Sequence, residues 1–297
     1  MKRNVLFAAI ATVAICSTAS AQEVKPLEDN RYLITTGNVQ MTVNAAEGGK
    51  VISYKYGEQE MLSQLRMQNQ YGSTFWTSPQ KEWNWPPVAE IDRHAYEGGI
   101  ENGVLTLKSK VARKVPFSIT KKYQPGKKSI KITYTITNEG DAARQVAPWE
   151  ISRVISSETG LIFFDAPVSQ IEAAQGDMIP FQGLENASWY NFEETRANRK
   201  INSDGNGWLA YAQDGLLMIK KFDDITPDQP APGEAEIQIY VNAGKTYIEL
   251  ESQGAYKTLE PGQSLDWSVD WILMPVKDAT PSKALLKTVR KSIKKIK

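Results

Sequence analysis

Two glutamates are spaced along the chain so that they could act as a pair. Tyr247, Glu249 and Glu251 alternate with Ile248 and Leu250. In an extended strand, alternate side chains share a face and stand ~7 Å apart along it. Two carboxylates at that spacing could work as general acid and base, or could bind sugar hydroxyl groups. An exposed outer strand face would produce the same pattern without any chemistry.

A second candidate for proton transfer is His94, because the chain has only one histidine. Histidine titrates near neutral pH, which suits a general acid or base. A hydrogen-bonded structural or surface histidine is the alternative. With one histidine and one cysteine, Cys16, a zinc site is excluded. No phosphate-binding loop or EF-hand spacing is present, so we expect no cofactor and no metal, although a calcium site built from carboxylates stays open.

Three tryptophans and a phenylalanine crowd into residues 75–85. They are Phe75, Trp76, Trp83 and Trp85, in a segment interrupted by prolines. Indole faces combine an apolar surface with a polar edge and can stack on sugar rings while neighbouring polar groups bond the hydroxyls. We therefore expect a saccharide platform here. The alternative is that the rings fold inward and plug one end of the core.

The segment from residue 148 to 153 adds two further candidates. Alternation places Trp149 and Arg153 on one strand face, with Glu150 and Ser152 on the other. Trp149 and Arg153 could stack on and hydrogen-bond a ligand in a cleft. A core tryptophan beside an arginine that extends toward solvent is the alternative. With Tyr247, these residues complete the expected binding set.

The elements that must hold these residues are strands. Period-two patterning dominates residues 30–276, and turn residues join neighbouring strands as hairpins. The pairs are 117–123 with 129–137, 207–212 with 216–222, and 235–241 with 246–251, and a last long strand covers 265–273. The sequence predicts an all-β fold, a large antiparallel sandwich over residues 22–279. Residues 66–99 and 165–206 are expected to form irregular loops.

A short amphipathic helix is predicted at the C-terminal end, over residues 280–297. Thr280 is the expected cap, Pro281 follows it, and apolar residues recur at helical spacing. Residues 277–297 contain eight Lys or Arg and one acid. We expect the apolar stripe to pack on the sandwich, and contact with an anionic membrane surface is the alternative.

Residues 1–21 have the three parts of a secretory signal peptide. Lys2 and Arg3 precede an apolar run, and Ala19-Ser20-Ala21 forms a small-residue cleavage site before Gln22. Anchoring through Cys16 as a lipoprotein is the alternative. We expect an exported protein, periplasmic or extracellular, whose mature form has no cysteine. Because acidic residues outnumber basic ones in residues 22–276, nucleic acid is excluded as a partner.

Several segments together resemble the galactose mutarotase-like group, in particular secreted bacterial proteins with that fold. The similar segments occur in the family's order and are spread over most of residues 22–297; they are 48–53, 72–76 with 85–87, 147–151, 207–211, 249–251 and 259–262. The resemblance implies a β-supersandwich whose concave face binds carbohydrate. Aldose 1-epimerases of the group use two histidines and a glutamate, and this chain has one histidine in all.

Three hypotheses follow. The first is a secreted carbohydrate-binding protein. The second is a carbohydrate-active enzyme, such as an epimerase, lyase or hydrolase, that uses His94 with Glu249 or Glu251. The third is an envelope or scaffold protein without catalysis.

Overall fold

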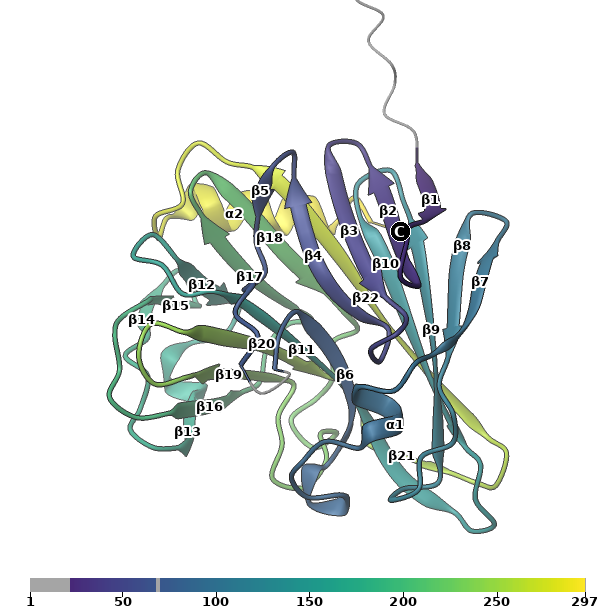
Figure 1. Ribbon diagram of the computed structural model, residues 1–297. Coiled ribbons are helices and arrows are strands. Elements are labelled where there is room, and N and C mark those ends of the chain that lie inside the picture. The colour runs from purple at the N-terminus through teal and green to yellow at the C-terminus, as the bar shows by residue number, and fades with distance from the viewer. Residues whose placement is uncertain (1–21, 68–69, 297) are drawn as a thin grey trace, which may run out of the picture.

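Two antiparallel sheets form the body of the molecule, which we describe from a computed structural model (Figure 1). The structure describes residues 22–67 and 70–296. Within these ranges the first sheet has twelve strands and the second has ten. Both sheets pair antiparallel throughout, as the hairpin pattern predicted. The predicted all-β sandwich is therefore confirmed.

The first sheet carries most of the candidate residues. Its main path is β1 (Glu23–Pro26), β2 (Arg31–Thr36), β3 (Val39–Asn44), β4 (Lys50–Tyr56), β6 (Ser73–Ser78), β11 (Arg144–Ile155), β20 (Tyr247–Gln253), β19 (Ile237–Val241), β16 (Arg199–Ser203) and β13 (Glu172–Gln175). Off this path, β5 (Gln59–Glu60) pairs with β4, and β21 (Lys257–Leu259) pairs with β11.

The second sheet backs the first. Its order is β14 (Gln182–Leu184), β15 (Ala187–Asn191), β12 (Leu161–Phe164), β17 (Trp208–Gln213), β18 (Leu216–Lys221), β22 (Ser264–Pro275), β10 (Ile130–Asn138), β9 (Phe117–Pro125), β8 (Val104–Lys108) and β7 (Glu97–Glu101). Phe75 of the first sheet stacks on Tyr134 of the second, with ring centroids 4.2 Å apart. The apolar core therefore lies between the sheets.

Strand β11 follows the predicted alternation and divides two environments. Glu150, on its core side, accepts a hydrogen bond from Tyr134 and pairs with the buried Lys220 at 2.8 Å. Trp149 and Arg153 lie on the other side, where they contact the carboxylates of β20. A buried charge needs a partner, and Lys220 supplies it for Glu150. This leaves the opposite face of β11 for the candidate site.

The prediction of an irregular loop over residues 66–99 is wrong for residues 73–78. Residues 73–78 form β6, a central strand of the first sheet in which every residue is buried. Because both faces are covered, the strand shows no polar and apolar alternation. Gly72 lets β6 approach β4: its φ is +60°, and a Cβ there would lie 2.3 Å from the Val51 carbonyl oxygen. Residues 165–206, also predicted irregular, contain β13, β14, β15 and β16.

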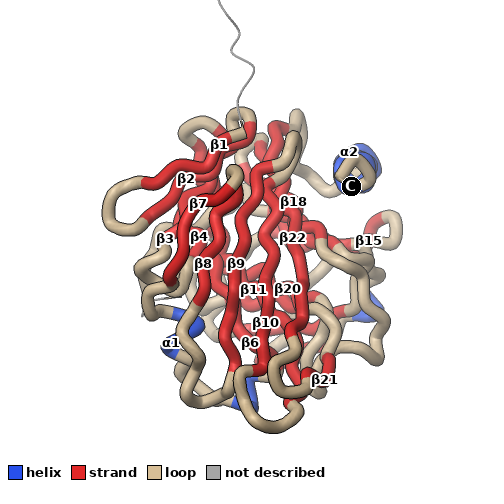
Figure 2. Tube along the Cα trace, turned by 90° about the vertical axis from the view of Figure 1, so that its right-hand side faces the viewer, coloured by secondary structure: helices blue, strands red, loops and turns tan. Residues whose placement is uncertain are grey.

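Two short α-helices lie outside the sheets, α1 (Ala89–Asp92) and α2 (Lys283–Ile293). Helix α2 begins later than predicted, because Ser282 caps it by accepting a hydrogen bond from the Leu285 backbone N–H. Leu285, Leu286 and Val289 are buried against the second sheet, as the packing interpretation expected. Figure 2 shows α2 as a separate layer beside β18 and β22. In the described part of the chain, neither helix has the length and apolarity to cross a bilayer.

Candidate functional site

A pocket of about 320 Å³ lies on the face of the first sheet that is turned away from the core. Strand β20 shows this orientation, because Ile248 and Leu250 pack into the core while Tyr247, Glu249 and Glu251 reach the pocket. This volume is at the small end of ligand-binding sites. The pocket is lined by Gln70, Trp76, Gln80, Trp85, Trp149, Gln175, Lys200, Tyr240, Tyr247, Glu249 and Glu251.

One wall of the pocket is aromatic. Trp76 and Trp149 are cross-strand neighbours on β6 and β11. Their rings pack edge to face, with centroids 5.3 Å apart. The ring centroids of Trp85 and Trp76 are 6.2 Å apart, and Trp85 is 55% exposed. Trp83 is different: it is 4% exposed and donates its indole N–H to the Thr77 carbonyl. Trp83 therefore packs behind Trp76 and does not line the pocket.

The position of Trp76 depends on a buried carboxylate that sequence reasoning missed. Asp92, at the end of α1, accepts hydrogen bonds at 2.9 Å from the Trp76 indole and the Thr74 hydroxyl. Its other oxygen lies 3.5 Å from the Lys50 ammonium. All four groups are buried. The indole of Trp76 is thus held by a charge-assisted bond from behind the pocket.

Glu251 is the buried carboxylate of the site. Its Oε2 accepts hydrogen bonds from the Trp149 indole at 2.8 Å and from Lys200 at 2.9 Å. Among the described residues, its Oε1 has no hydrogen-bond partner. Burial raises the pKa of Glu251, Lys200 opposes that shift, and Glu249 adds to it. Oε1 is therefore an acceptor, or a proton carrier, that the protein itself leaves unused.

Glu249 is held by the second ion pair of the site. Its Oε1 lies 2.8 Å from the Arg153 Nη2, which also donates to the Gln70 side-chain oxygen. The Arg153 side chain is 1% exposed and Glu249 is 13% exposed. The guanidinium lies 5.8 Å from the Trp76 ring centroid and 5.9 Å from that of Tyr247. Burial, followed by the charge of Glu249, raises the pKa of Tyr247 well above its ordinary value.

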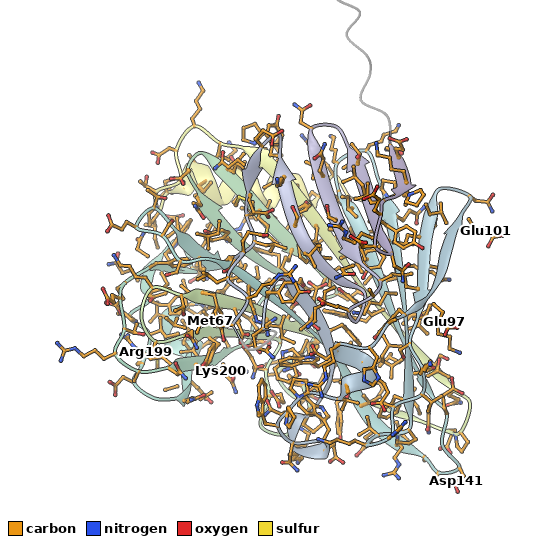
Figure 3. The ribbon with its side chains drawn as sticks, in the orientation of Figure 1. Met67, Glu97, Glu101, Asp141, Arg199 and Lys200 are labelled. Atoms are coloured by element: carbon orange, nitrogen blue, oxygen red, sulfur yellow. The ribbon has the colours of Figure 1, made fainter. Side chains whose placement is uncertain are left out.

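Lys200 and Tyr240 complete the polar side of the pocket. Lys200 lies 4.9 Å from the Trp149 ring centroid in addition to its bond with Glu251. It lies on the side of the molecule opposite Glu97 and Glu101 of β7 (Figure 3). Sequence reasoning missed Lys200 because β16 falls in a stretch predicted to be irregular. Tyr240 lies in a predicted strand, so alternation across the hairpin to Glu249 could have identified it.

His94 lies outside the pocket. Its side chain is exposed, and its backbone carbonyl accepts the Gly48 N–H at 2.8 Å. The structure therefore brings together Trp76, Trp85, Trp149, Tyr247, Glu249 and Glu251, with Arg153 behind them. It does not bring Trp83 or His94 to the same surface. A catalytic role for His94 stays a prediction that this pocket does not support.

The fold is similar to those of several solved structures. A crystal structure of a putative aldose 1-epimerase from Escherichia coli K12 aligns with a TM-score of 0.61 and 14% identity, covering 83% of this chain and 99% of that one. A galactose mutarotase-like protein from Lactobacillus casei aligns with a TM-score of 0.59 and 11% identity, and the alignment covers 82% of this chain and 99% of that one. A galactose mutarotase-like protein from Clostridium acetobutylicum aligns with a TM-score of 0.58 and 12% identity, and the alignment covers 86% of this chain and 98% of that one. No protein-family profile and no curated protein sequence matches the chain.

Proposed function

We propose, from the galactose mutarotase-like fold that this chain has and from the pocket on its first sheet, that the protein binds a saccharide. The observation that carries the proposal is that the exposed Trp85 ring lines the same pocket as the carboxylates of Glu249 and Glu251. A sugar ring has apolar C–H faces and a rim of hydroxyls. It therefore needs an aromatic surface and fixed hydrogen-bonding groups in one pocket.

The polar groups of the pocket suit hydroxyl recognition. Lys200 and the amides of Gln80 and Gln175 can donate, and Glu249 and the free Oε1 of Glu251 can accept. Charge-assisted bonds to hydroxyls are stronger than neutral ones. Because Arg153 and Lys200 balance the two carboxylates, the pocket favours a ligand without a large net charge.

A glycan array probed with the purified protein, followed by calorimetry on each hit, tests the proposal. We expect at least one saccharide to bind, and we expect Trp85→Ala to weaken it about tenfold, which corresponds to ~1.4 kcal/mol. Ile100→Ala is the control, since Ile100 is also an exposed apolar residue, at 37%, and lies on β7 of the second sheet, outside the pocket. Absence of binding across the array would contradict the proposal.

A second candidate function is acid–base catalysis on the bound sugar. It is favoured by the raised pKa of Glu251 and the unused Oε1 of that group, with Glu249 two residues away on the same strand face. A positioned acid or base contributes ~10²–10⁴-fold to a rate. Turnover of a panel of sugars, with anomer exchange followed by NMR, should fall by that factor in Glu251→Gln. Unchanged turnover in this variant would exclude Glu251 as the catalytic group.

We further propose that the protein is exported. The support is the pattern of residues 1–21, which lie outside the described residues. N-terminal sequencing of the protein from cell fractions should find Gln22 first, in the periplasm or the medium. A protein that begins at Met1 in the cytoplasm would contradict this.

A further inference from the structure

A second pocket, of about 400 Å³, adjoins the saccharide pocket along β13 and β16. The cross-strand pair Gln175–Lys200 lines the saccharide pocket. The pair Glu172–Asn202, which lies two residues further along β16 and beyond a register shift in β13, lines the second pocket. Two residues along a strand span ~7 Å, a step on the scale of one sugar ring. A ligand of two or more linked units could therefore occupy both pockets.

The border between the pockets is a fixed carboxylate. Glu234 lines the second pocket and accepts a hydrogen bond from the backbone N–H of Gln80, which lines the first. Its other oxygen accepts from the amides of Gln238 and Gln253, at 3.0 and 3.1 Å. The two pockets thus share a wall that is held by several hydrogen bonds.

Two acidic side chains of the second pocket each keep one buried oxygen without a hydrogen-bond partner among the described residues. Glu236 is fully buried; its Oε2 accepts the Gly205 N–H at 2.7 Å. Among the described residues, its Oε1 has no hydrogen-bond partner, and neither does the buried Oδ1 of Asp204. No described Lys, Arg or His lines this pocket, although Glu172 and Glu234 do. A buried acceptor without a donor costs free energy that a ligand donor would recover.

The chemistry of this pocket favours an ammonium group over a metal ion. In the described part of the chain, no three His, Cys, Asp or Glu residues are grouped as a metal site requires. An ammonium group brings its own positive charge and three N–H donors, so two free carboxylate oxygens are enough to fix it. Hydroxyls alone could satisfy the acceptors but would leave the negative charge of the pocket unbalanced.

We propose that the second pocket binds the ammonium group of an amino-sugar unit, as part of a saccharide whose neighbouring unit occupies the tryptophan-lined pocket. Glu236 and Asp204 would accept its N–H donors. This inference rests on the proposed saccharide-binding function and defines the class of saccharide. An N-acetylated unit would bind worse, since its amide has no charge and only one N–H.

Binding should also release a proton. Burial raises the pKa of Glu236 to about 8; the charges of Asp224 and Asp204 add to this shift, and the backbone hydrogen bond from Gly205 opposes it. At pH 7 the empty site therefore holds Glu236 mainly as the neutral acid. A bound ammonium ion favours the carboxylate, so the carboxyl proton passes to the buffer when the ligand enters.

Calorimetry with three β-1,4-linked dimers tests the inference; each has one glucose unit, and the other unit is glucosamine, N-acetylglucosamine or glucose. We expect the glucosamine-containing dimer to bind at least tenfold more tightly than the other two at pH 7. Repeating the titration in two buffers of different ionisation enthalpy should show proton release only for that dimer. Glu236→Gln and Asp204→Asn should each remove the preference, with melting curves confirming that both variants fold.

Equal affinity for the three dimers, or a preference that survives in both variants, would overturn the inference and leave the saccharide-binding proposal intact. Failure of the glucosamine-containing dimer to bind would also overturn it. The proposed function fails on a different result, an empty glycan array. The two proposals can therefore be separated.

Discussion

The indole N–H of Trp149 on β11 donates to the Oε2 of Glu251 on β20 at 2.8 Å, which joins the aromatic wall of the pocket to its buried carboxylate. Lys200 reaches the same oxygen from β16, at 2.9 Å. Three strands that are distant in the sequence thus fix one side chain. The remaining oxygen of Glu251 has no hydrogen-bond partner in the described part of the chain.

Removing Lys200 should raise the pKa of Glu251 further. The Lys200 charge is the main influence that opposes burial at this carboxyl, so Lys200→Met leaves the neutral acid favoured. Carbon-13 NMR of labelled glutamate side chains across a pH titration would measure the shift. Trp149→Phe should move the pKa in the same direction by less, because it removes one hydrogen bond and no charge. A Glu251 pKa that does not move in Lys200→Met would refute this account of the ion pair.

Replacing Trp83 and replacing Trp85 should have different effects on the free energy of unfolding. Trp83→Ala should lower the free energy of unfolding by ~3–5 kcal/mol, since the ring is buried behind Trp76. Trp85→Ala removes a ring that is 55% exposed and should cost less than ~1 kcal/mol of stability. Urea denaturation of both variants measures the difference. Similar losses of stability would mean that Trp85 is a core residue and not a platform.

Asp92 should be needed for the shape of the aromatic wall. Asp92→Ala removes the acceptor of the Trp76 indole and a carboxylate beside the buried Lys50. Breaking such a buried pair costs ~3–5 kcal/mol. Asp92→Asn keeps an acceptor oxygen for Trp76 and should cost less while retaining saccharide binding. Equal losses of unfolding free energy in Asp92→Ala and Asp92→Asn would show that the charge of Asp92, and not its hydrogen bond with Trp76, stabilises this region.

Glu236 should make stability depend on pH in an unusual direction. Its folded-state pKa, about 8, is above the ordinary value of 4.5, so between these pH values the unfolded chain loses a proton that the folded chain keeps. The contribution of this group to the free energy of unfolding therefore falls as pH rises from about 4.5 to 8, by an amount on the order of a few kcal/mol. Glu236→Gln should flatten the stability curve over that window, as measured by denaturation at pH 5 and pH 8. An unchanged slope would contradict the raised pKa.

The start of α2 offers a direct check on the corrected helix boundary. Ser282→Ala should destabilise the protein by ~0.5–2 kcal/mol, because the Ser282 hydroxyl accepts the Leu285 N–H. Thr280→Ala, at the cap position that the sequence predicted, should have a smaller effect, since its hydroxyl bonds only Asp278. Thermal melts of the two variants decide between these caps.

The sequence predicted best where strands are half-buried. Alternation on β11 and β20 identified which residues of 149–153 and 247–251 share a face, and those residues do meet across the sheet. Alternation failed at β6, because that strand is buried on both faces and its Ser, Thr, Phe and Trp residues follow no polar and apolar alternation.

The candidate site was incomplete for a related reason. Lys200, Gln70 and Asp92 reach it from segments without a clear period, and only the pairing of distant strands brings them together. The spacing of the tryptophans predicts one cluster, but composition does not distinguish the exposed Trp85 from the buried Trp83. The chemistry of the imidazole makes His94 a candidate, but sequence alone does not show that its side chain is exposed and lies outside the pocket.

The central claim is that a saccharide binds between Trp85 and Glu251. The most direct test is calorimetric titration of the best glycan-array hit into the unmodified protein, Trp85→Ala, Glu251→Gln and the Ile100→Ala control. We predict that affinity falls about tenfold or more in the first two variants and is unchanged in the control, with all four proteins folded. Binding that is equal in all four would place the saccharide elsewhere and would contradict the account.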